Sequence, residues 1–260
     1  MEISNRNKLG IIIGLFVFFI LALLFIPPIP QLVGYHNFAD SRPWLGIPNF
    51  NDVMSNVGFV GVGLFGLVKI IRGGLFDISF DRLPYVIFFV AVTLIGLGSG
   101  YYHWAPSNGS LFWDRLPMTT AFMSFFAAVI ADRIHKQVGI YFMLPILLIA
   151  GAFSLIYWQQ TEAVGAGDLR FYGMVQFYPF VAIPAIIWLF RDYRYTKSQQ
   201  LLWVIGVYIF AKLLEHFDTE VFNLLGDFVS GHSLKHLAAA VATFMILSML
   251  TSARNSKISI

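Results

Sequence analysis

The sequence predicts an all-α fold, a polytopic bundle of membrane-spanning helices, and three observations support this prediction. Of the 260 residues, 58% are hydrophobic and 12% are charged, whereas a soluble domain carries about 25% charged residues. The mean hydropathy is +0.73. Long uncharged apolar stretches recur along the chain, separated by short polar ones. So few charges cannot cover a water-facing surface, but they suit a surface solvated by lipid.

The first apolar stretch, from Leu9 to about Ile26, is long enough to cross a bilayer. Because Arg6 and Lys8 precede it, a signal peptide is the alternative interpretation. The stretch is long for a signal peptide, however, and it ends at Pro27-Pro28-Ile29-Pro30 without a small-residue cleavage site. We therefore predict a retained transmembrane helix.

Seven more spans are predicted, and their connections are mostly short and polar. They lie at about residues 52–71, 84–105, 115–131, 139–158, 172–190, 200–217 and 231–251. We divide the chain into an N-terminal transmembrane helix (1–30), an extracytoplasmic connecting segment (31–51), a seven-helix core (52–251) and a cytoplasmic tail (252–260).

The distribution of lysine and arginine predicts the orientation, because cytoplasmic loops are enriched in both. With eight spans, one side holds twelve of these residues: Arg6, Lys8, Lys69, Arg72, Arg82, Arg133, Lys136, Arg191, Arg194, Lys197, Arg254 and Lys257. The other side holds four: Arg42, Arg115, Arg170 and Lys235. Both termini are therefore expected in the cytoplasm.

Composition also limits the partners and the metal ligands. The formal net charge of +3 is scattered along the chain, which does not favour a nucleic-acid partner. There is no cysteine, so a metal site would need histidine and carboxylate ligands.

Polar residues inside membrane spans are costly, and here several share one depth. Ser99 and His103 are four residues apart at the end of the third span, and His232 and His236 have the same spacing at the start of the eighth. Asp114 begins the fourth span. This spacing places each pair on one helix face, and the topology places all five near the extracytoplasmic boundary. Two histidines at i and i+4 can bind one metal ion together with a third ligand.

Each of these residues also has a structural interpretation. Ser99 can be a small residue that allows close helix packing, beside Gly96, Gly98 and Gly100. Asp114 can cap its helix or pair with Arg115. Together, however, these alternatives require coincident depth and coincident spacing, and the combination favours a metal site.

A second polar group lies in the seventh span. Lys212 and Glu215 are three residues apart, which favours a structural ion pair. Together with Asp218, they can alternatively support the metal ligands from outside the first shell. Tyr172 and Gln176 start the sixth span and are candidates to line a cavity.

These motifs resemble those of a known family. Ser99-x3-His103, Asp114 and His232-x3-His236 resemble the alkaline ceramidase branch of the CREST membrane hydrolase superfamily, which includes adiponectin-receptor-like proteins. The segment 51–56, Asn-Asp-Val-Met-Ser-Asn, is similar to the family's opening segment, and the resemblance covers about residues 35–251.

The resemblance implies a seven-helix core with Zn²⁺ bound by His103, His232 and His236, and with Ser99 and Asp114 beside the zinc. The first helix is then an addition to this core. Animal members have an acidic calcium-binding segment before the first core helix. Here the corresponding region holds little acid beyond Asp40 and Asp52, which does not favour calcium regulation.

The expected function is that of a zinc-dependent lipid hydrolase that cleaves the acyl amide of ceramide-like lipids. Asp114 is the expected general base and Ser99 the expected hydrogen-bond donor to the carbonyl oxygen. The alternatives are a hydrolase of another N-acyl or ester lipid, an adiponectin-receptor-like signalling or lipid-sensing protein and, less favoured, a transporter. We expect a bacterial inner-membrane location, with the site near the extracytoplasmic side.

Overall fold

The computed structural model describes residues 3–258, and its regular secondary structure in this range is entirely helical, as the sequence predicts. The ten α-helices are α1 (Asn5–Phe25), α2 (Phe50–Met54), α3 (Val57–Arg72), α4 (Leu83–Trp104), α5 (Asn108–Arg133), α6 (Leu144–Ala163), α7 (Arg170–Leu189), α8 (Ser198–His216), α9 (Asp218–Leu224) and α10 (Gly231–Ile258). Short 3₁₀ turns precede α2 (Val33–His36) and α4 (Ser79–Arg82), and a π-helical turn (Val138–Met143) precedes α6.

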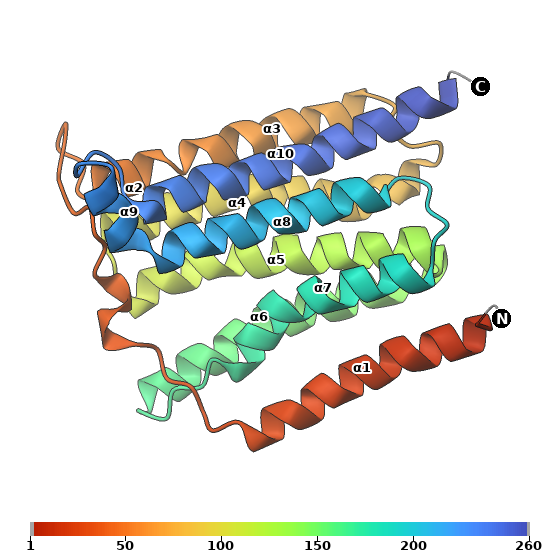
Figure 1. Ribbon diagram of the computed structural model, residues 1–260, viewed down its shortest axis with the longest axis horizontal. Helices are drawn as coiled ribbons and strands as arrows, with labels where there is room; N and C mark the ends of the chain where they lie inside the picture. Colours follow the sequence, from red (N-terminus) through yellow and green to blue (C-terminus); the bar gives the residue numbers. More distant parts are fainter. Residues whose placement is uncertain (1–2, 259–260) are drawn as a thin grey trace.

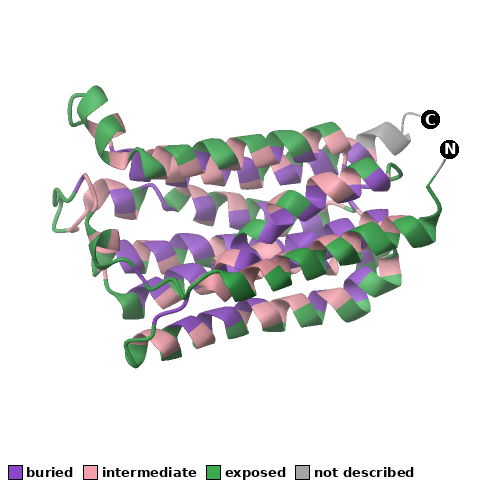
Figure 2. Ribbon diagram, turned by 60° about the horizontal axis from the view of Figure 1, so that its bottom comes forward, coloured by how far each residue is buried: buried purple, intermediate pink, exposed green. Residues whose placement is uncertain are grey.

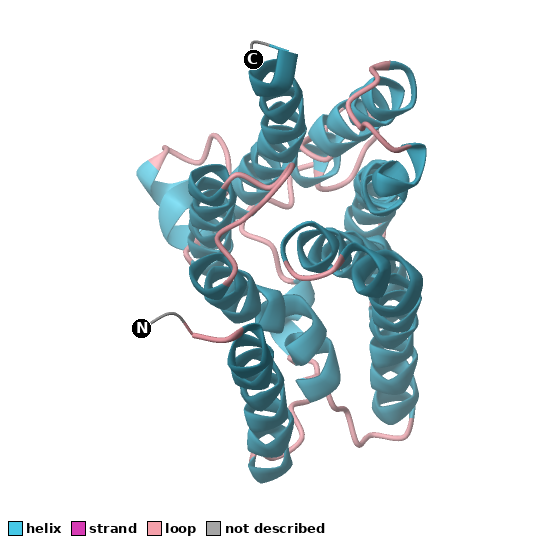
Figure 3. Ribbon diagram, turned by 90° about the vertical axis from the view of Figure 1, so that its right-hand side faces the viewer, coloured by secondary structure: helices cyan, strands magenta, loops and turns pink. Residues whose placement is uncertain are grey.

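The long helices run side by side as one elongated bundle (Figure 1). The two chain ends lie at one end of this bundle, and the short helices α2 and α9 lie at the other (Figure 1). The end-on view in Figure 3 shows that the helices surround a central region rather than forming a single layer. Every predicted span corresponds to a long helix of this bundle.

Six helical segments within the described residues are long and apolar enough to cross a membrane, and a seventh is added if α8 and α9, bent by 81°, count as one span. The protein is therefore a multi-pass membrane protein.

The helix α5 is not among these segments, although it has 26 residues. It carries Asp114, Arg115, Asp132 and Arg133. Because α5 packs against α4, α6 and α7, three of these side chains, Asp114, Arg115 and Arg133, are buried in protein instead of facing lipid.

The helices are buried on their inner faces and exposed on their outer faces (Figure 2). The inner faces meet in an apolar core that includes Phe89, Val92, Ile186 and Leu250, each 0% exposed. Large apolar side chains such as Phe18 and Trp188 remain 64% exposed, as expected for positions that contact lipid tails.

Glycines let α4 approach its neighbours closely. A Cβ atom on Gly98 would lie 2.2 Å from the backbone oxygen of Trp113 in α5, and one on Gly96 would lie 2.8 Å from the backbone oxygen of Asn56. Small residues at such positions are typical of helix packing in membranes. These contacts fix α4, which ends in the predicted Ser99-x3-His103 motif, against α3 and α5.

The first helix is an outer addition that rests on α7. The rings of Phe16 and Phe19 each make an edge contact with Tyr178, at 5.6 Å between centroids. The Arg170 guanidinium donates to the backbone oxygens of Leu23 and Ile26, at the end of α1. Arg170 also pairs with the loop residue Asp168 and thereby lowers the pKa of that carboxyl to about 2. The pair therefore stays ionised at neutral pH and holds the end of α1.

At the other end of the chain the helix is longer than predicted. The last predicted span ends at residue 251, whereas α10 continues to Ile258 through most of the predicted cytoplasmic tail, residues 252–260. The last two residues of that tail, 259–260, and the first two of the N-terminal segment, 1–2, lie outside the described residues.

Candidate metal centre

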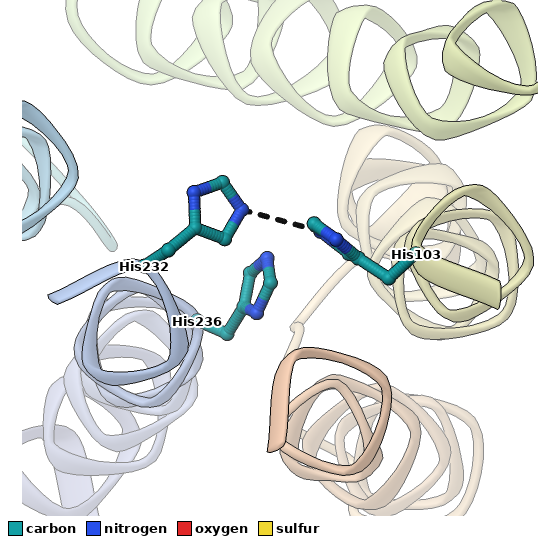
Figure 4. Close-up of side chains that lie close together, drawn as sticks. All are labelled: His103, His232 and His236. Carbon is teal, nitrogen blue, oxygen red and sulfur yellow. Dashed lines mark hydrogen bonds between the residues drawn. The ribbon is translucent and has the colours of Figure 1, made fainter. Parts of the chain in front are cut away.

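Three histidines from two helices meet at the end of the bundle opposite the chain termini. His103 lies in the last turn of α4, and His232 and His236 lie one turn apart at the start of α10. Each offers one ring nitrogen, and these three atoms lie within 4.8 Å of one another. Figure 4 shows the three rings gathered around a common space. The predicted triad therefore converges in the structure.

The triad is almost completely buried, since His103 is 1%, His232 6% and His236 2% exposed. The Nε2 atoms of His103 and His232 are 3.2 Å apart. The Nδ1 atom of His103 and the Nε2 atom of His236 are buried without a hydrogen-bond partner. Such unpaired buried polar atoms are unfavourable. A cation bound by imidazole nitrogens would satisfy the unpaired Nε2 of His236 and replace the close contact between the other two, so the cluster fits a metal ion.

Ser55 sets the orientation of one of these rings. Its Oγ lies 2.8 Å from Nδ1 of His236 and donates to the backbone oxygen of Asp52 at 3.1 Å. The Asn56 amide nitrogen also lies 3.4 Å from this Nδ1. A hydroxyl has one proton, so in the tautomer that carries the ring proton on Nδ1, Ser55 accepts from the Nδ1–H of His236. The lone pair of His236 is then on Nε2, the nitrogen that faces the other histidines, as a metal ligand requires.

The backbone around the other two histidines is also held by side chains. Asn49 donates from Nδ2 to the backbone oxygen of His103 at 2.8 Å. Asp218, the first residue of α9, accepts from the backbone nitrogen of His232 at 2.7 Å and so satisfies the first turn of α10. Asp218 thus holds the backbone of a candidate ligand.

A largely apolar cavity leads from the triad into the bundle. At its polar end it is lined by Ser99, Asp114 and His236. Apolar residues of α3, α4, α5, α7, α8 and α10, among them Phe122 and Ile183, also line it. A cavity of this kind, apolar with polar groups at one end, is typical of a ligand site.

Ser99 is placed differently from the glycines around it. Gly96 and Gly98 make the close approaches to α3 and α5 described above, and no atom of another residue lies within 4 Å of a Cβ on Gly100. Ser99 is 2% exposed and lines the cavity beside Asp114. Close packing therefore accounts for Gly96 and Gly98, whereas Ser99 lines the space where a ligand would lie.

The structural alternatives for Asp114 do not match its position. The helix α5 begins at Asn108 with Ser107 as its N-cap, not near Asp114, so Asp114 caps nothing. The part of the chain that the structure describes contains no ion pair between Asp114 and Arg115. The Arg115 guanidinium instead contacts the rings of Tyr35, Trp158 and Tyr172. Asp114 is thus a buried carboxylate at the polar end of the cavity.

The second polar group forms the ion pair that we expected and gains a further member. Lys212 pairs with Glu215, and Lys235 of α10 lies 3.3 Å from the other oxygen of that carboxylate. All three side chains line the cavity. The group therefore links α8 to α10 next to His236.

Tyr172 and Gln176 are not among the residues that line this cavity. Tyr172 packs over Arg115, and Gln176 donates from Nε2 to the hydroxyl of Tyr208 at 3.1 Å. Tyr208 does line the cavity, so Gln176 contacts a cavity-lining residue without lining the cavity itself.

We expect replacement of Ser55 with alanine to weaken metal binding without removing it. Loss of such an outer contact to a ligand lowers metal affinity by about 10- to 100-fold. Competition titration with a chromogenic chelator measures this affinity. The matched control is Ser154→Ala, since Ser154 is also buried but donates to the backbone oxygen of Gly151 in its own helix. Equal affinity in Ser55→Ala and the control would remove the assigned role of Ser55.

The comparison with known proteins bears on the same region. The chain matches the model of the family described as ceramidase over residues 47–258. No curated protein matches it. The matched part contains α2 to α10, and therefore all three histidines, Ser99 and Asp114, whereas α1 and most of the connecting segment precede it. Since the match covers most of the chain, the protein belongs to the ceramidase family of lipid amide hydrolases.

Proposed function

We propose that this protein is a zinc-dependent intramembrane hydrolase that cleaves the acyl amide bond of ceramide-like lipids. The observation that carries the proposal is the buried histidine triad beside a largely apolar cavity inside a membrane-spanning bundle. The family supplies the reaction class, and the cavity suits a ligand with a long apolar chain.

Zinc is the metal that this ligand set favours. Three neutral imidazoles with no thiolate and no carboxylate among them are typical of a catalytic zinc site that keeps one position open. His103, His232 and His236 would hold the ion. When bound, Zn²⁺ polarises an acyl carbonyl as a Lewis acid and lowers the pKa of water to about 7.

Asp114 and Ser99 are proposed to act on the substrate from the polar end of the cavity. The Asp114 carboxylate takes a proton from the attacking water and returns it to the nitrogen of the leaving amine. The Ser99 hydroxyl donates a hydrogen bond to the acyl oxygen, where negative charge develops. Because both side chains are buried, these interactions are little weakened by bulk water.

Lys212, Glu215 and Lys235 are proposed to fix this end of the cavity. Lys235 precedes the ligand His236 in α10, and its ion pair with Glu215 fastens it to α8. A carboxylate between two ammonium groups in a half-buried site is held in place by both. The group therefore keeps α8 and α10 in register around the triad.

We also propose that both termini are cytoplasmic, that the triad lies near the extracytoplasmic face, and that the membrane is a bacterial inner membrane. The first two parts of this proposal are supported by the twelve-to-four distribution of lysine and arginine and by the position of the triad where α4 ends and α10 begins, at the end of the bundle opposite the termini (Figure 1). On this basis the segment 31–51 is extracytoplasmic and the end of α10 is cytoplasmic.

We expect His236→Ala to lose both bound zinc and ceramide hydrolysis. Two remaining histidines make an incomplete ligand set, so zinc should fall from about one per chain to a trace. Elemental analysis of purified protein measures the metal, and fatty-acid release from fluorescent ceramide, with and without chelator, measures turnover. His216→Ala is the control, because His216 lies outside the triad and makes an edge contact with Phe217. Undiminished hydrolysis by metal-free protein would refute the zinc mechanism.

Replacement of Asp114 with asparagine should separate proton transfer from metal binding. The amide keeps the shape of the side chain but cannot act as a base, so turnover should fall by about 10²- to 10⁴-fold. Zinc content should stay at the wild-type level, because Asp114 is not one of the three ligands. Asp192→Asn, at an exposed position, is the control. Wild-type turnover in Asp114→Asn would exclude Asp114 as the base.

A further inference from the structure

The segment that connects α1 to the core places an aromatic ring directly on two of the candidate ligands. The Phe38 ring lies 4.6 Å from the ring of His103 and 4.8 Å from that of His232, measured between centroids. It also makes an edge contact with Tyr102 at 5.8 Å. Phe38 thus stands against the triad although it precedes the first core helix.

Phe38 and the cavity contact different members of the histidine triad. Of the three histidines only His236 lines the cavity, and Phe38 does not. His103 and His232, which do not line it, are the two that Phe38 contacts. The triad therefore has the apolar cavity on one side and the Phe38 ring on the other.

The residues next to Phe38 are fastened to three different helices. The amide oxygen of Asn108 in α5 accepts from Nε2 of His36 at 3.1 Å, and Nδ1 of His36 lies 2.9 Å from the hydroxyl of Tyr102 in α4. The backbone nitrogen of Ala39 donates to Asp218 of α9 at 3.0 Å. Phe38 lies between His36 and Ala39, so both of its flanks are held.

The rest of the segment is held as firmly. The guanidinium of Arg42 donates to both oxygens of Asp40 at 2.7 Å and to the backbone oxygen of Phe228 at 3.1 Å. Although burial opposes ionisation, the hydrogen bonds from Arg42 and Asn51 keep the pKa of Asp40 below its usual value. The pair therefore stays charged at neutral pH and joins the segment to the loop before α10.

We propose that Phe38 is a positioning residue that forms the outer wall of the metal centre, on the side away from the cavity. This inference rests on the proposed function for the presence of a bound metal. The ring covers the imidazoles of His103 and His232 and keeps water and dissolved chelators of the outer phase away from their nitrogens. An apolar shell of this kind controls solvent access to a metal site.

The family match begins at residue 47, so this wall comes from a part of the chain outside the matched region. The core supplies the ligands and the cavity. The preceding segment supplies the cover, and it is tied in place by side chains of α4, α5 and α9.

The test is the rate at which the zinc-loaded full-length protein loses its metal to an excess of EDTA. We expect Phe38→Ala to lose zinc at least about 10-fold faster than wild type, because an outer-shell change of this kind alters metal binding by about that factor. Phe38→Leu keeps an apolar side chain over the rings and should stay near the wild-type rate. Trp44→Ala is the matched control, since Trp44 lies in the same segment but packs on Phe50 instead of the triad.

A second variant covers the case in which Phe38→Ala does not fold. His36→Phe keeps an aromatic ring but removes the hydrogen bonds to Tyr102 and Asn108, so it should also accelerate zinc loss. Wild-type rates in Phe38→Ala, or in His36→Phe where Phe38→Ala does not fold, would overturn the inference and leave the proposed function intact. A wild-type protein that binds no zinc would overturn both.

Discussion

The site depends on one constraint, the meeting of the last turn of α4 with the first turn of α10 at one end of the bundle. The helix α3 packs against both of them. Glycines on α4 bring its end close to α3 and α5, and Asp218 satisfies the exposed backbone at the start of α10. Because two histidines one turn apart face a third on another helix, a small relative shift of α4 and α10 would separate the ligands. The helix packing therefore determines the chemistry.

The same packing explains why a membrane protein can bury so many polar side chains. Charged groups facing lipid are unfavourable, so they are found where protein or a cavity surrounds them. The central helix α5 follows this rule, since Asp114 faces the cavity and Arg115 is enclosed by aromatic rings. The Lys212, Glu215 and Lys235 group follows it as well. Two nitrogens of the buried triad, Nδ1 of His103 and Nε2 of His236, have no hydrogen-bond partner, and a cation bound to Nε2 of His236 would satisfy that atom, which is the physical argument for a metal.

The sequence predicts the spans and the His232–His236 pair because both depend on short-range spacing, whereas His103 is added as the third ligand by the family resemblance and the predicted topology. Apolar stretches of sufficient length identify the helices, and the i, i+4 spacing of His232 and His236 places them on one face. The start of α5 was predicted too late, because its first turns, Asn108 to Asp114, are too polar to be recognised as a membrane span. The capping role considered for Asp114 was wrong for the same reason.

The contacts that orient the site were missed, because they join residues distant in the sequence. Ser55 meets His236, Asn49 meets the backbone of His103, and Phe38 meets two histidines, all across different segments. No periodicity marks such pairs. The only signal was the polar run at residues 51–56 in front of an apolar helix, which indicates a functional segment without indicating its partners.

We propose that three imidazoles from α4 and α10 bind one cation. Zinc K-edge X-ray absorption on the purified protein measures this coordination. We expect one zinc ion per chain, with three histidine nitrogens coordinating it at about 2.0–2.1 Å. An absence of zinc, or a first shell without histidine nitrogens, would contradict it.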